Sequence, residues 1–253
     1  MILKFEVFAR KLGRNIPVHM YLPDSYMTAQ EDYPVLYMFD GHNLFYDEDA
    51  TYGRSWRLID HLKNPDLPDL IVVGIECNHE GNRRLIEYAP FPFYDDEFGG
   101  DLPAEGSRTM HFIVHDLKPY IDAHFPTRTD RLNTFIGGSS CGGLMGLYGA
   151  YRYSSVFSKG LAISPYIVPS LSSLKADISK TYIRQPENIY FSWGAREGYT
   201  AHEFVMETKA VTEISNILIQ KGCRLKFNMK VYGEHTEASW ESEADDFLRF
   251  LLR

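Results

Sequence analysis

A chain of 253 residues is long enough to build one large α/β domain or two small ones around a substantial hydrophobic core. Its 34 acidic residues outnumber its 26 basic residues, giving a formal net charge of −8. Because no run of basic residues is longer than two, the concentrated positive surface that nucleic acids require is not expected.

The cysteines and the uncharged segments indicate a cytoplasmic protein. Cys77, Cys141 and Cys223 are far apart and odd in number, so they fit neither a disulfide framework nor a zinc-binding spacing. Unpaired cysteines are the default of a reducing compartment. The N-terminus alternates in polarity, unlike a secretory signal. The longest uncharged run, residues 133–151, is too rich in glycine and serine for a transmembrane helix.

Strands and helices alternate along most of the chain. Residues 2–9 and 16–22 predict an antiparallel hairpin. Apolar runs at 34–39 and 70–76 predict strands that are buried on both faces. Residues 77–106 follow no regular pattern, which in a compact domain indicates a functional or mobile loop. Further strands are predicted at 132–136, 159–164, 189–193 and 224–232, and helices at 55–63, 107–125, 203–221 and 238–252, with a short helix or loop at 170–181.

This alternation predicts an α/β fold with a mostly parallel central sheet and helices on both of its faces. The sequence contains no linker and no internal repeat, so we expect residues 1–253 to form a single domain. In such sheets the catalytic groups lie beyond the carboxyl ends of the strands, and the residues that follow each strand are therefore the candidates.

The strongest motif is GSSCG at residues 138–142, which fits G-x-S-x-G with Ser140 in the middle. It lies between the predicted strand 132–136 and a helical pattern that begins near Leu144. A sharp strand-to-helix turn of this kind presents the serine hydroxyl clear of the backbone as a nucleophile. The N-H group of Cys141, at the start of the helix, is placed to stabilise an oxyanion. A glycine-rich turn without catalytic function is the alternative reading.

Two further strand ends supply a base and an acid. His235 follows the last predicted strand and could accept the proton of Ser140, and Glu197 follows the strand at 189–193 and could orient that imidazole. Each residue alone is compatible with an ordinary surface position. The chain order Ser140, Glu197, His235 nevertheless matches the order nucleophile, acid, base of the α/β hydrolases.

The strand at 34–39 is followed by a turn that contains His42, whose backbone N-H would be the second oxyanion donor.

Aromatic side chains are frequent in the loops and suit sugar or phenolic groups, although such residues also simply pack. His111 and His115 are four residues apart, but the segment lacks the glutamate of H-E-x-x-H, so no metal site is expected. We expect substrate contacts from Asp40, Asn43, Trp56, Tyr88 and Tyr166.

Six segments, in this order, resemble the putative esterase family of the α/β hydrolases. That family includes esterase D (S-formylglutathione hydrolase), feruloyl and acetylxylan esterases, siderophore esterases and mycolyltransferases. The segments are DGHNLF at 40–45, NRRLIEYAP at 82–90, IGGSSCGGL at 136–144, AISPY at 162–166, GAREG at 194–198 and GEHTEASW at 233–240.

The resemblance implies an α/β-hydrolase fold with no large lid domain. It also implies that Ser140 is the nucleophile, His235 the base and Glu197 the acid, with oxyanion N-H groups from His42 and Cys141. The family usually has methionine where Cys141 stands. Because this position acts through its backbone, the exchange is not expected to abolish activity.

These features predict a serine carboxylesterase that acts on short-chain or aromatic acyl esters, including esters carried by carbohydrates, without a cofactor or a metal. An acyltransferase that uses a sugar acceptor and a non-catalytic binding protein with the same fold are the alternatives. The expected partner is a small-molecule or carbohydrate ester, with neither a nucleic acid nor a membrane. The sequence leaves the natural ester, the oligomeric state and the role of residues 78–106 open.

Overall fold

The computed structural model describes residues 1–28, 30–96, 98–183 and 188–253. An eight-stranded sheet runs through its centre in the order β1-β2-β4-β3-β7-β8-β9-β10. Pairing is antiparallel between β1 and β2 and between β2 and β4, and parallel for the rest, which confirms the predicted mostly parallel sheet and N-terminal hairpin. The strands are β1 (Ile2–Ala9), β2 (Arg14–Tyr21), β3 (Val35–Phe39), β4 (Ile71–Ile75), β7 (Thr134–Ser139), β8 (Lys159–Ile163), β9 (Asn188–Gly194) and β10 (Arg224–Lys230).

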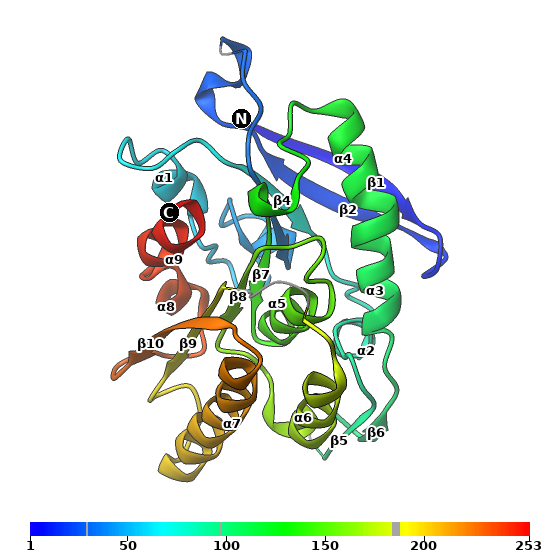
Figure 1. Cartoon of the computed structure of the whole chain (residues 1–253), viewed down its shortest axis with the longest axis vertical. Coiled ribbons are helices and arrows are strands. Elements are labelled where there is room, and N and C mark those ends of the chain that lie inside the picture. The colour runs from blue at the N-terminus through cyan, green and yellow to red at the C-terminus, as the bar shows by residue number, and fades with distance from the viewer. Residues whose placement is uncertain (29, 97, 184–187) are drawn as a thin grey trace.

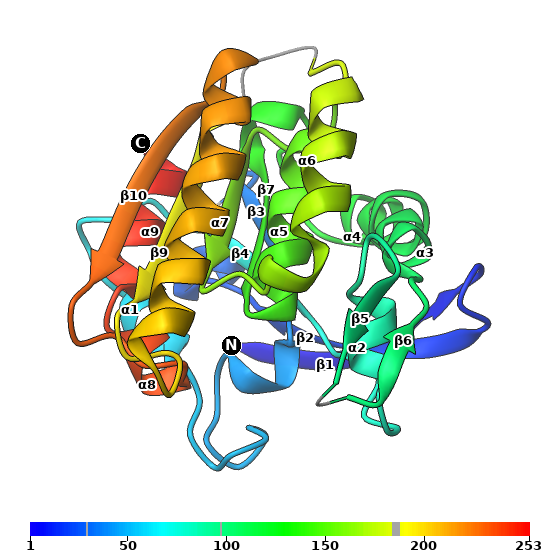
Figure 2. The ribbon, with the colours of Figure 1, turned by 90° about the horizontal axis from the view of Figure 1, so that it is seen from below.

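Helices cover both faces of the sheet, as predicted (Figures 1 and 2). One hydrophobic cluster joins the sheet to α3–α7, and a second joins its other face to α1, α8 and α9. None of the described helices combines the length and apolar character that crossing a bilayer demands. The helices are α1 (Leu58–Leu62), α2 (Arg83–Glu87), α3 (Gly106–Phe112), α4 (Lys118–His124), α5 (Cys141–Arg152), α6 (Leu171–Lys180), α7 (Ala201–Gln220), α8 (Glu237–Glu241) and α9 (Ala244–Leu252).

Several element predictions needed correction. The segment 77–106 is more regular than predicted, because it contains α2 and a small antiparallel pair, β5 (Phe93–Asp95) and β6 (Gly100–Leu102). The predicted helix 107–125 is interrupted by a π-helical segment, Ile113–Leu117. Pro119 lacks an N-H group and so leaves the carbonyl of His115 without its helical partner. Arg10 donates to that carbonyl instead, at 3.2 Å.

The predicted last helix is divided into α8 and α9 at Glu243, whose buried carboxylate holds the two final strands and helices together. It accepts hydrogen bonds from Tyr190 and Ser192 of β9 at 2.8 and 3.0 Å, and from Lys230 of β10 at 2.7 Å. The ammonium group of Lys230 also donates to the carbonyl of Ser239 at 2.9 Å. The network therefore ties the loop that carries His235 to the sheet.

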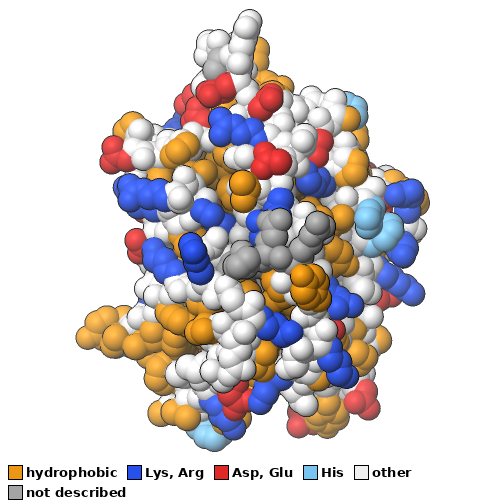
Figure 3. Space-filling model, viewed as in Figure 1, with side chains coloured by type: hydrophobic (Ala, Val, Ile, Leu, Met, Phe, Trp, Pro, Cys, Tyr) orange, Lys and Arg blue, Asp and Glu red, His pale blue; other side chains and the backbone are white. Residues whose placement is uncertain are grey.

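The edge strand β10 carries Arg224, Lys226 and Lys230, and charges of this kind discourage pairing with another chain. Figure 3 shows basic and acidic side chains interspersed over the face that bears α5–α7, with hydrophobic side chains gathered near the end of β10. Exposed hydrophobic residues there include Val231 and Tyr232.

Helix α5 lies unusually close to the sheet because glycines form the contact. A Cβ atom added to Gly146 would lie 2.3 Å from the carbonyl oxygen of Leu161 in β8, and one added to Gly143 would lie 2.5 Å from that of Ile163. A Cβ on Gly142 would meet the Cβ of Phe39, in β3, at 2.8 Å. The position of the start of α5 is therefore fixed by close contacts with the backbone of β8 and with Phe39 of β3.

We predict that Gly146→Ala lowers the free energy of unfolding. Alanine normally stabilises a helix by about 1 kcal/mol relative to glycine. Here the added methyl group overpacks the contact with β8, at a cost of about 1–3 kcal/mol. Urea unfolding measures the difference. The exposed α7 position Asn216→Ala is the control and should be neutral or slightly stabilising. A Gly146→Ala protein at least as stable as the parent would contradict the close packing.

Candidate active site

Ser140 occupies a strained turn between β7 and α5. Its backbone has φ 56° and ψ −125°, a region that side-chain-bearing residues rarely adopt. Its N-H donates to Ile163 at 3.0 Å, and its carbonyl oxygen accepts from the N-H groups of Leu144 and Tyr166, both at 3.0 Å. These bonds hold the turn from both sides. The residue is half-buried and lines a cavity of about 620 Å³.

His235 lines the same cavity, and its partner is Glu197. The Nδ1 atom of His235 lies 3.2 Å from Oε2 of Glu197. The side chain of Glu197 is only 3% exposed, whereas that of His235 is 38% exposed. The imidazole also packs edge-on against the ring of Trp240, with centroids 5.0 Å apart. Glu197 is thus a buried carboxylate that fixes one nitrogen of a more accessible histidine.

The orientation of Glu197 is set by Ser164, at the end of β8. The hydroxyl of Ser164 donates to Oε1 of Glu197 at 2.7 Å and accepts from Nε1 of Trp240 at 2.8 Å. The backbone N-H of Gly194 donates to the same Oε1 atom. The carboxylate therefore has one oxygen held by the scaffold and the other directed at His235. The sequence reasoning gave Ser164 no role, because a serine after a strand carries no distinctive signal.

A second carboxyl group, that of Glu207 on α7, lies against Glu197. Burial is the main reason why the pKa of Glu207 is raised to about 8. The negative charge of Glu197 and a hydrogen bond between the two carboxyl groups raise it further. At neutral pH Glu207 is therefore protonated and donates a hydrogen bond to the Glu197 carboxylate. Two adjacent carboxyl groups rarely ionise together, which is the physical reason why Glu207 holds its proton.

Ser140 and His235 line one cavity, but no hydrogen bond joins these two described residues. Catalytic hydrogen bonds are often long in ligand-free structures and tighten when substrate binds.

The turn after β3 brings His42 to the cavity wall. It is a short 3-10 helix, Gly41–Asn43, and a Cβ on Gly41 would lie 2.4 Å from the backbone of Gly74 in β4. The preceding Asp40 has a left-handed backbone, φ 58°, and accepts two bonds from Arg84, at 2.8 and 2.7 Å. Burial would raise the pKa of Asp40, but the charge and hydrogen bonds of Arg84 outweigh it and lower that pKa.

Cys141 is the first residue of α5, so its N-H group has no partner within the helix. Its side chain is buried, 5% exposed, and does not line the cavity. Burial raises the pKa of its thiol, which makes the neutral form dominant. The part of Cys141 that is available to the site is therefore its backbone N-H group.

The five residues expected to contact substrate lie in different places. Asp40 and Asn43 line the cavity. Trp56 is buried instead among aromatic rings, 5.7 Å from Trp240, and Tyr88 is buried with its ring 4.9 Å from that of Phe39.

Tyr166, also outside the cavity lining, is half-buried, and its hydroxyl donates to Asp95. These three aromatic side chains pack behind the cavity rather than line it. The sequence pattern does not distinguish an aromatic side chain that lines a cavity from one that packs in the core.

The cavity lining also includes residues that the sequence reasoning did not select. Thr51 and Arg54 come from the loop after β3, and Cys77 and His79 from the loop after β4. His42, Cys77 and His79 place potential metal-ligand atoms within 4.8 Å of one another. Cys77 and His79 are the second and fourth residues after β4, so their position after a strand was the signal that could have identified them.

The fold matches solved esterase structures. The chain superposes over its whole length on an IroE-like serine hydrolase from Shewanella oneidensis, with a TM-score of 0.76, 19% identity and 80% of that chain covered. It also superposes over 99% of its length on the enterobactin esterase FES from Shigella flexneri, with a TM-score of 0.73, 19% identity and 59% of that chain covered. Likeness at this level of identity shows the shared α/β fold.

Curated relatives are more similar in sequence but longer. The uncharacterized protein YbbA of Bacillus subtilis is 29% identical over 147 residues, which are 57% of this chain and 54% of the relative. Esterase Rv1288 of Mycobacterium tuberculosis is 28% identical over 149 residues, 58% of this chain and 27% of the relative. The matches therefore span about half or less of these relatives.

A family model covers nearly the whole chain. The model described as Putative esterase matches residues 9–251. This chain therefore belongs to the Putative esterase family.

Proposed function

We propose that this chain is a serine carboxylesterase that forms an acyl-enzyme on Ser140. The observation that carries the proposal is the placement of Ser140 on a strained turn, in the same cavity as a histidine 3.2 Å from a buried carboxylate. Membership of the Putative esterase family supports ester hydrolysis as the reaction.

In the proposed reaction the Nδ1-H of His235 donates to Glu197, which leaves Nε2 as the free acceptor. Ser140 attacks the ester carbonyl carbon while Nε2 takes the hydroxyl proton, and the imidazolium then protonates the leaving alcohol. Water repeats these steps on the acyl-enzyme, releases the acid and restores the serine. Glu197 stays charged and stabilises the imidazolium.

The tetrahedral intermediate carries a negative oxygen, for which the backbone N-H groups of Cys141 and His42 are the proposed donors. The first belongs to a helix N-terminus, whose dipole favours negative charge. The second belongs to the turn that the Asp40–Arg84 ion pair holds in place. Neither role needs the side chain.

The proposed substrates are short-chain or aromatic acyl esters, including esters borne by carbohydrates. A cavity of about 620 Å³ lies within the range of small-molecule sites. One structural neighbour is a ferulic acid esterase, and another was solved in the presence of 2,3-dihydroxy-N-benzoyl-serine, so aromatic acyl groups are handled on this fold. Arg54 also lines the cavity, with its guanidinium group in an ion pair with Glu241.

We predict that Ser140→Ala lowers kcat for p-nitrophenyl acetate and for feruloyl esters by at least about 10³-fold, because the acyl-enzyme cannot form. The same variant should not react with a fluorophosphonate probe. The matched control is Ser215→Ala, a buried serine of α7 whose hydroxyl has no partner among the described residues. Substantial hydrolysis by Ser140→Ala would refute the proposed nucleophile.

Glu207 gives a pH-dependent prediction. Its pKa is raised to about 8 in the folded protein, against an ordinary value of 4.5. The folded state therefore binds this proton more tightly, and the contribution of Glu207 to stability declines as pH rises from 4.5 to 8. Glutamine donates a similar hydrogen bond to Glu197 but cannot ionise.

The Tm advantage of Glu207→Gln over the parent should consequently grow between pH 5 and pH 8 and level off above pH 8. Thermal unfolding at a series of pH values tests this expectation. Glu48→Gln, in an exposed loop, is the control and should show no such trend. An advantage that does not change with pH would argue against a protonated Glu207.

A further inference from the structure

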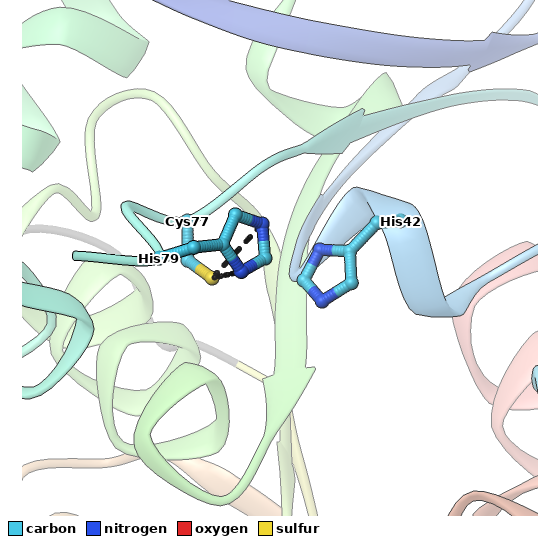
Figure 4. A group of neighbouring side chains, drawn as sticks. All are labelled: His42, Cys77 and His79. Atoms are coloured by element: carbon cyan, nitrogen blue, oxygen red, sulfur yellow. Dashed lines mark hydrogen bonds between the residues drawn. The ribbon is translucent and has the colours of Figure 1, made fainter. Parts of the chain in front are cut away.

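Three side chains in the cavity wall converge from two loops and are not used by the proposed reaction. His42 comes from the turn after β3, and Cys77 and His79 come from the loop after β4 (Figure 4). One potential ligand atom from each residue lies within 4.8 Å of the other two, and Sγ of Cys77 is 3.8 Å from Nδ1 of His79. The two imidazole rings pack edge to face, with centroids 4.7 Å apart and planes at 72°.

We propose that His42, Cys77 and His79 form a binding site for a thiolate- and imidazole-preferring divalent metal ion such as Zn²⁺. Ligand atoms of a tetrahedral zinc site lie about 3.4–3.6 Å apart, given Zn-N near 2.0–2.1 Å and Zn-S near 2.3 Å. The most widely separated of these atoms therefore need to approach one another by at most about 1.2–1.4 Å to coordinate an ion. A set of two nitrogen atoms and one sulfur atom suits zinc and its neighbours rather than magnesium or calcium.

The surrounding hydrogen bonds single out one nitrogen on each histidine. Nε2 of His42 is 2.9 Å from the hydroxyl of Thr51, and Nε2 of His79 is 3.0 Å from a carboxylate oxygen of Glu76. Such outer partners are typical of metal-binding histidines, since they fix the ring and leave the other nitrogen as the ligand. Nδ1 is then the ligand atom of both rings.

The unused nitrogen of His42 is the most informative atom. The residue is 6% exposed, and its Nδ1 is buried without a hydrogen-bond partner among the described residues. Buried polar atoms are almost always satisfied, so an orphan beside a cysteine and a histidine points to a missing partner.

The thiol of Cys77 must lose its proton to coordinate a metal ion. This thiol is buried and lies beside the Asp40 carboxylate. Metal binding would replace this proton and release it to solvent. Three protein ligands leave a fourth position for water, open to the cavity that Ser140 lines.

Cobalt spectroscopy tests the site independently of esterase activity. Titrating Co²⁺ into the purified full chain should produce a thiolate-to-cobalt charge-transfer band and the visible bands of a tetrahedral ion, saturating at one equivalent and reversed by Zn²⁺. Cys77→Ser should abolish the charge-transfer band. His79→Asn changes a side chain that is 53% exposed, so it should fold normally and weaken Co²⁺ binding at least about tenfold.

Three control variants distinguish this site from other cysteine and histidine residues that could bind Co²⁺. Cys223→Ser removes another buried cysteine and should keep the band. His111→Asn disrupts a histidine pair with centroids 4.6 Å apart on the α3 side, and His235→Asn removes the proposed base; both should retain binding. The proposal is overturned if the parent protein shows no charge-transfer band at saturating Co²⁺. A band that survives in Cys77→Ser, or one that disappears in His111→Asn or His235→Asn, overturns it equally.

Discussion

The backbone contact between α5 and strands β7 and β8 is the constraint on which the rest of the site depends. Because glycines replace side chains at this contact, the first turn of α5 comes within van der Waals distance of the strands, and Ser140 is forced into its strained conformation. The same approach directs the positive end of the helix at the cavity. The glycines of this contact thus determine both how closely α5 packs on the sheet and where the positive end of its dipole lies.

The other groups of the site are assembled on that fixed point by buried polar contacts. Ser164 connects Trp240 to Glu197, and Glu197 connects to His235, so residues after three different strands share one chain of hydrogen bonds. On the opposite wall, Arg84 neutralises the buried Asp40 and thereby holds the turn that carries His42. Both carboxylates accept their hydrogen bonds from protein groups close to them.

The sequence predicted the sheet, the hairpin and most helices, because apolar runs and helical periodicity are local signals. It missed α2 and the β5–β6 pair, whose few residues carry no periodicity, and the interruption after Glu241, which depends on the contact between Glu243 and β9. For the site, the residues after strand ends were identified as candidates from position alone. The burial of Trp56 and Tyr88, and the convergence of Cys77 and His79 with His42, depend on tertiary packing that periodicity does not encode.

The network around Glu243 has a consequence for how the protein opens. The loop with His235 follows β10, which lies at the edge of the described sheet beside β9, whereas Ser140 follows a strand with neighbours on both sides. Local opening of an edge requires less free energy than global unfolding. We therefore expect His235 to be displaced more readily than the fold around Ser140. The contacts of Glu243 with Tyr190, Ser192 and Lys230 oppose that displacement.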